Sequence, residues 1–77
     1  MQINLHLHGI LRDQLPAEKK GKTTLTLQAG ATLQDLLYLL KFNRPVQAAV
    51  NNEVELADDH PLTEGDEVAL FTVIGGG

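Results

Sequence analysis

Apolar and polar residues alternate near the start of the chain, as they do in half-buried β-strands. Residues 2–8 follow this alternation up to Gly9, which ends the first predicted strand. A second alternating segment, rich in β-branched residues, covers residues 23–27. We therefore predict a hairpin whose long loop spans residues 10–22. Two apolar residues are expected to anchor this loop to the core, Ile10 and Leu15.

A helical pattern follows the hairpin. Four leucines recur at the spacing of one helix face, Leu33, Leu36, Leu37 and Leu40. Thr32 is a good N-cap, and Asp35 adds an acid to the first turn. Pro45 prevents continuation, so the helix is expected to end near Lys41.

Three short strands are predicted in the second half. An apolar segment at residues 46–50 turns at Asn51-Asn52 and returns as residues 53–56. After a loop, Gly65 leads into the last strand, residues 67–74. This element order predicts one α+β domain over residues 1–77, of the β-grasp or ubiquitin-like type. Its mixed sheet of four or five strands would carry one main helix on one face, and the last strand would lie centrally beside the first.

Composition excludes several classes of function. The chain has no cysteine, which excludes disulfides, zinc thiolates and a cysteine nucleophile. Six Lys and Arg residues against ten Asp and Glu give a net charge of −4, too little positive charge for nucleic-acid binding. No signal peptide or membrane span is visible, so we expect a cytoplasmic protein that binds no membrane. The acids gather late in the sequence, which predicts either an acidic region beside the C-terminal tail that favours a partner with a basic docking face, or only a solvated surface, the interpretation that charge alone favours.

The side chains offer no catalytic set. His6 and His8 share one face of the first strand, but a metal site would need a third ligand. Asp58-Asp59 lacks the alternating acids of a calcium loop. A Ser-His-Asp set is impossible because the chain contains no serine. We therefore predict no metal, no bound cofactor and no catalytic side chain.

Three glycines close the sequence directly after the last predicted strand: Gly75, Gly76 and Gly77. Without side chains they would form a thin, flexible tail whose carboxylate can enter a narrow channel in another protein. A frayed end is the alternative. Paired glycines are uncommon by chance, since glycine occupies about 7% of positions.

The last strand is apolar on both faces. One face must meet the helix, and the other is predicted either to be an exposed docking surface next to the tail or to be covered by Leu11 or Leu15. The docking interpretation assigns partner contacts to Phe71, Val73 and Ile74.

Three segments resemble the ThiS/MoaD family of sulfur carriers: Ala48-Ala49-Val50-Asn51, the run His60-Pro61-Leu62-Thr63-Glu64-Gly65-Asp66-Glu67-Val68-Ala69-Leu70-Phe71, and the Gly-Gly end. Gly9 and the Leu11-Arg12 pair are similar as well. The resemblance covers the whole chain and is densest over residues 48–77.

The resemblance implies a protein co-substrate and not an enzyme. In that family a ubiquitin-activating-type adenylyltransferase consumes ATP to adenylate the terminal glycine, and a sulfur donor then replaces AMP to leave a thiocarboxylate. Gly77 would carry the sulfur, Gly76 would complete the required pair, and Gly75 is an additional glycine.

The sulfur acceptor stays open between two pathways. The Val73–Gly77 end resembles the thiamine-pathway carrier, which serves a thiazole synthase. The long loop at residues 10–22 and His60-Pro61-Leu62 resemble the small subunit of molybdopterin synthase, which binds a large subunit, and the loop favours this branch. Two other functions remain: a ubiquitin-like modifier conjugated through Gly77, and a non-covalent β-grasp binding module.

Overall fold

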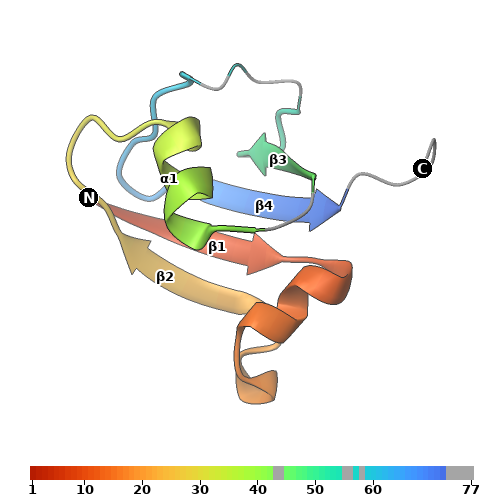
Figure 1. Ribbon diagram of the computed structural model, residues 1–77. Coiled ribbons are helices and arrows are strands. Elements are labelled where there is room, and N and C mark those ends of the chain that lie inside the picture. The colour runs from red at the N-terminus through yellow and green to blue at the C-terminus, as the bar shows by residue number, and fades with distance from the viewer. Residues whose placement is uncertain (43–44, 55–56, 58, 73–77) are drawn as a thin grey trace.

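The computed structural model describes residues 1–42, 45–54, 57 and 59–72. A four-stranded sheet carries one α-helix on one face, and two short 3-10 helices follow the first strand (Figure 1). The elements are β1 (Gln2–Leu7), η1 (Gly9–Gln14), η2 (Ala17–Lys19), β2 (Lys22–Thr26), α1 (Leu33–Leu40), β3 (Val46–Val50) and β4 (Glu67–Thr72). The predicted α+β, β-grasp architecture is confirmed.

The sheet has the strand order β2-β1-β4-β3. β1 pairs antiparallel with β2 and parallel with β4, with Leu5 opposite Val68 and Leu7 opposite Leu70. β3 pairs antiparallel with β4 on its other side. The last strand therefore lies centrally beside the first, as the element order predicts.

The core lies between the sheet and α1. Leu36 of the helix is fully buried, as are Val68 and Leu70 at the centre of β4. Alternate residues of β1 and β3 complete it, together with one residue each from α1, η1 and the loop before β4: Ile3, Leu5, Leu7, Ala48, Val50, Leu33, Leu11 and Leu62. Each buried leucine or valine contributes about 1.5–3 kcal/mol relative to an exposed one, so α1 is held mainly by this face.

The start of α1 has the predicted cap. Thr32 Oγ1 accepts a hydrogen bond from the Asp35 backbone at 3.3 Å, and an Asp35 carboxylate oxygen accepts one from the Thr32 backbone at 2.9 Å. Lys41 ends the helix in the left-handed conformation, with φ of 54°. The helix boundaries thus follow from local signals in the sequence.

The loop at residues 10–22 is anchored differently from the prediction. Ile10 is 54% exposed, so its predicted role as an anchor is wrong, whereas Leu11 is buried and Leu15 packs against the core. Gly9, with φ of +60°, opens a 3-10 turn in which the Leu11 backbone donates to the His8 carbonyl at 3.2 Å. This turn directs Leu11 inward and leaves Ile10 outside.

Two predicted strands differ in extent from the observed ones. The predicted return strand at residues 53–56 is reduced in the described residues to one bridge between Glu53 and Val50. Residues 55–56 lie outside the described residues, as do residues 73–74 of the last predicted strand.

Candidate functional site

The end of β4 is fixed on both sides. Thr72, its last residue, pairs with Val46 at the start of β3. On the other side, the His8 backbone donates to the Leu70 carbonyl at 3.0 Å, where β1 ends. The chain therefore leaves the sheet at the edge where β1 ends and β3 begins, which we call the exit edge (Figure 1).

Of the predicted docking and tail residues, Phe71 alone lies within the described part of the chain. Val73, Ile74, Gly75, Gly76 and Gly77 lie outside it. The structure therefore places the strand that leads to them and leaves their roles as predictions.

Phe71 lies on the sheet face opposite α1, which we call the outer face. Its neighbours Leu70 and Val68 are fully buried against the helix side, and side chains alternate along a strand. Phe71 is half-buried, and Ala69 on the same face is also half-buried. Leu11 belongs to the core and Leu15 packs against the same core, so neither residue supports the predicted alternative in which Leu11 or Leu15 covers this face.

The outer face carries a small apolar strip on β4 and β3 that polar side chains flank. Beside Phe71 and Ala69, strand β3 contributes Ala49, which pairs with Ala69. A hollow bordered by His6, Asn51 and Glu67 opens above the two alanines. The apolar strip therefore runs along β4 to Phe71, which pairs with Gln47 of β3.

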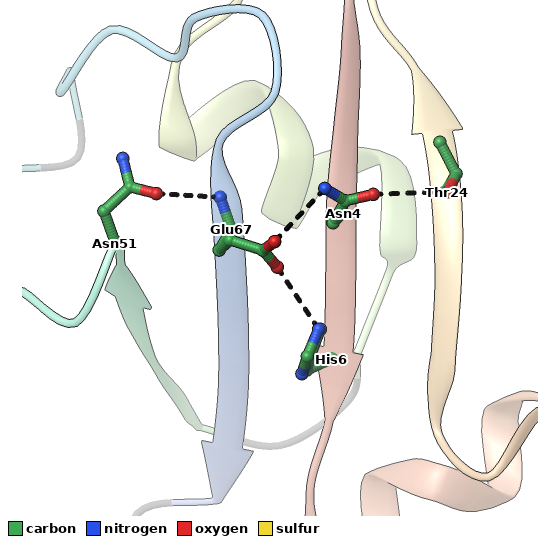
Figure 2. A network of polar contacts seen from close by, with 5 residues as sticks. All are labelled: Asn4, His6, Thr24, Asn51 and Glu67. Atoms are coloured by element: carbon green, nitrogen blue, oxygen red, sulfur yellow. Dashed lines mark hydrogen bonds and ion pairs between the residues drawn. The ribbon is translucent and has the colours of Figure 1, made fainter.

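A polar network crosses the other part of the outer face (Figure 2). Asn4 Nδ2 donates to Glu67 Oε1 at 3.3 Å, and Thr24 Oγ1 donates to Asn4 Oδ1 at 3.4 Å. His6 Nε2 lies 3.3 Å from the second carboxylate oxygen, Glu67 Oε2. The network joins three strands, β2, β1 and β4, and aligns them beneath the hollow.

Asp66 positions the start of β4. Its buried carboxylate accepts hydrogen bonds from the Thr63 backbone at 2.8 Å and from the Thr63 hydroxyl at 2.9 Å. Burial alone would raise the pKa of Asp66, but the hydrogen bonds from Thr63 and Asn51 outweigh it and hold the pKa below its usual value. The Leu-Thr-x-Gly-Asp segment is thus a structural turn that sets which residues of β4 face α1.

Charge is divided between the two ends of the sheet. Gly65 donates to the Gln2 carbonyl at 2.7 Å, and Asn4 donates to the Asp66 carbonyl at 2.8 Å, so the acidic turn lies at the start of β1. The exit edge instead carries most of the cations. These are Arg12, Lys19, Lys20 and Lys22 beside the end of β1, with Lys41 at the end of α1.

The described part of the predicted acidic region therefore lies at the start of β4 and not at its end, so it gives no support to a basic docking face beside the tail; the alternative, a solvated acidic surface, stays a prediction. Glu64, Asp66 and Glu67 are close to the tail in sequence. However, Thr72 at the end of β4 lies five residues beyond Glu67, about 17 Å along the strand, because a strand rises about 3.3 Å per residue. The total of six Lys and Arg does not reveal the cationic cluster; the position of four of them within residues 10–22 is the signal in the sequence.

Metal ligation and membrane spanning find no candidate in the described ranges. Over these residues, no group of three or more His, Asp or Glu side chains could hold a metal ion. Among the helices that the structure describes, none has the length and apolar character needed to cross a membrane. What the arrangement can do is to hold one strand rigidly and present its end.

Comparison with known proteins agrees with this architecture. A model of the ThiS family matches residues 11–77. None of the curated proteins matches the sequence.

Three solved structures share the fold at 19% identity each, which shows the fold alone. SAMP1 from Haloferax volcanii aligns over 100% of both chains with a TM-score of 0.74. The Pyrococcus furiosus protein assigned as subunit 1 of molybdopterin converting factor aligns over 96% of this chain and 99% of its own, with a TM-score of 0.81. A Helicobacter pylori complex of subunits 1 and 2 of molybdopterin-converting factor contains a chain that aligns over 100% of both, with a TM-score of 0.66.

Proposed function

Because the chain belongs to the ThiS family, we propose that it is a sulfur carrier whose Gly77 carboxylate is converted to a thiocarboxylate. The observation that carries the proposal is the central position of β4. Strand β4 is paired on both sides and leads directly toward the glycine segment. A rigid strand followed by residues without side chains suits delivery of a backbone carboxylate into another protein's active site.

The chemistry requires activation by a partner. A carboxylate oxygen of Gly77 attacks the α-phosphorus of ATP, which releases pyrophosphate and leaves an acyl adenylate. A sulfide-level sulfur from the donor then attacks the carbonyl carbon, and AMP departs with the bonding electrons. The carrier supplies no acid, base or bound cofactor, so the adenylyltransferase provides the catalysis and the carrier is a co-substrate.

We favour sulfur donation in molybdopterin biosynthesis over sulfur donation in the synthesis of the thiamine thiazole. Two of the structural neighbours are molybdopterin-converting factor proteins, and the Helicobacter pylori structure pairs subunit 1 with subunit 2. We propose a corresponding large subunit as partner, with a thiazole synthase as the alternative. Phe71, Val73 and Ile74 would contact it, and both proteins would lie in the cytoplasm.

Intact-mass measurement tests the carrier function. Incubation with ATP, a sulfur donor and the cognate adenylyltransferase should replace one oxygen by sulfur at Gly77, a gain of about 16 Da. A chain lacking Gly76-Gly77 is the control and should gain nothing. Unchanged mass of the full chain with the true partner rejects the proposal, and retention of cellular function by the shortened chain would favour a non-covalent binding module.

A second candidate is a ubiquitin-like modifier, favoured by the full-length structural match to SAMP1, described as a small archaeal modifier protein. In this function the activated Gly77 carbonyl would form an isopeptide bond with a lysine amine of a target. Digestion of cell lysate and mass spectrometry would find lysines that carry the Gly77 end. Absence of such adducts under inducing conditions counts against it.

A further inference from the structure

The basic cluster at the exit edge lines a groove. Arg12 of η1, Lys20 after η2 and Lys22 of β2 border it, together with His8 at the end of β1. All four side chains are exposed. Within the described ranges, none of these three Lys and Arg side chains lies within ion-pair distance of a carboxylate. The groove lining therefore carries three cations and no acid, and the two acids of the same loop, Asp13 and Glu18, form no ion pair with these cations.

The backbone holds these cations in place. The Leu7 backbone donates to the Gly21 carbonyl at 2.6 Å, which ties the loop to the end of β1. Lys20 and Gly21 have φ of 55° and 77°, two successive left-handed residues that turn the chain into β2. Gly21 is buried beneath Arg12, and a Cβ built on it would lie 2.9 Å from Arg12 Cγ. The groove is thus built on hydrogen-bonded backbone and close packing.

Among the residues that the structure describes, cations and acids are unequally distributed along the direction of β4. Five cations and two acids, Asp13 and Glu18, lie toward the edge from which the chain leaves the sheet, whereas the acids Glu64, Asp66 and Glu67 lie at the other end. The electric field of an acidic partner surface would therefore orient the domain so that its exit edge faces that surface. Electrostatic orientation of this kind raises association rates by about 10- to 1,000-fold at low ionic strength.

We propose that the groove formed by His8, Arg12, Lys20 and Lys22 docks an acidic surface at the channel mouth of the protein that receives the tail. The inference rests on the proposed function, since the activating enzyme is the partner to which it applies. A nucleic acid is disfavoured because the net charge is −4 and the acidic end repels a polyanion. The groove would align the carrier so that the end of β4 faces the channel.

Two variants of equal net charge test the docking. K20Q/K22Q removes two charges from the groove, and Q28E/Q34E adds two acids near the start of α1, at the far end; both change the net charge from −4 to −6. Binding of each full-length chain to the cognate adenylyltransferase is measured by calorimetry at about 50 and 500 mM salt. We expect K20Q/K22Q to raise Kd about tenfold at low salt and little at high salt, where charges are screened. Q28E/Q34E should change Kd less than about twofold.

Three outcomes separate this inference from the carrier function. The docking proposal is overturned if wild type and K20Q/K22Q have equal Kd values, or if K20Q/K22Q and Q28E/Q34E lose the same amount of affinity. A wild-type chain that binds through the groove but gains no sulfur supports the docking and rejects the carrier function. If wild type and K20Q/K22Q bind equally and gain sulfur at the same rate, the carrier function stands and the docking is wrong. Circular dichroism of both variants checks that the fold is retained.

Discussion

The side-chain amide of Asn51 donates from Nδ2 to Oδ1 of Asp66 at 3.0 Å, which joins the end of β3 to the start of β4. Asn51 Oδ1 also accepts a hydrogen bond from the Glu67 backbone at 3.0 Å. Asn51 has a left-handed φ of 51°, which asparagine tolerates better than most residues. The two side chains therefore fix the first residue of the strand that leads to the tail.

Replacing Asp66 should destabilise the fold without touching the core. The carboxylate of Asp66 accepts three hydrogen bonds, from the Asn51 amide, the Thr63 backbone and the Thr63 hydroxyl. Asp66→Asn replaces this charged acceptor by a neutral amide. We expect the free energy of unfolding in urea to fall by about 1–3 kcal/mol, the range for hydrogen bonds to a buried charged group. Asp59→Asn, an exposed acid nearby in sequence, is the control and should change it by less than about 0.5 kcal/mol.

The same carboxylate should make stability depend on pH. Because the folded pKa of Asp66 lies below the unfolded value of about 3.9, its contribution is complete above that pH. It is lost as pH falls through the folded pKa. The difference in unfolding free energy between wild type and Asp66→Asn should therefore stay constant from about pH 7 to pH 5 and narrow as pH falls below about 4. A difference that stays constant or widens below about pH 4 would contradict this assignment.

The sequence contained enough to predict α1 and the position of β4. Helical periodicity and the Thr32–Asp35 cap are local signals, and the order of elements restricts where the last strand can lie. The orientation of Leu11 and Ile10 was not accessible, because it depends on a 3-10 turn that begins at Gly9. The position of the acids relative to the end of β4 was not predicted for a related reason. Residues that are close in sequence lie far apart in space when an extended strand separates them.

Gly21 should tolerate no side chain. A Cβ at this position would lie 2.5 Å from the Leu7 carbonyl oxygen, in addition to the cost of φ at +77°. Gly30 is a matched control, with φ of +87° and no atom within 4 Å of its Cβ position. We expect Gly30→Ala to lower the free energy of unfolding by about 1 kcal/mol and Gly21→Ala by at least about 2 kcal/mol more.

The comparison is made by urea unfolding of both variants. Equal losses would mean that backbone conformation alone determines the effect and that the loop moves away from Leu7 without cost. A larger loss in Gly21→Ala would show that the loop is held closely against β1, as the groove of basic residues requires.

Phe71 should matter for the partner more than for the fold. Phe71→Ala removes a half-buried side chain from the outer face, and Leu70→Ala removes a fully buried one from the core side of the same strand. We expect Leu70→Ala to lower the free energy of unfolding by about 2–5 kcal/mol and Phe71→Ala by about 1 kcal/mol. In the intact-mass assay Phe71→Ala should need at least about tenfold more carrier for half-maximal sulfur gain, since a central aromatic contact contributes about 2 kcal/mol to an interface. If Phe71→Ala loses stability as Leu70→Ala does while its sulfur gain keeps the wild-type concentration dependence, Phe71 supports the fold and makes no docking contact.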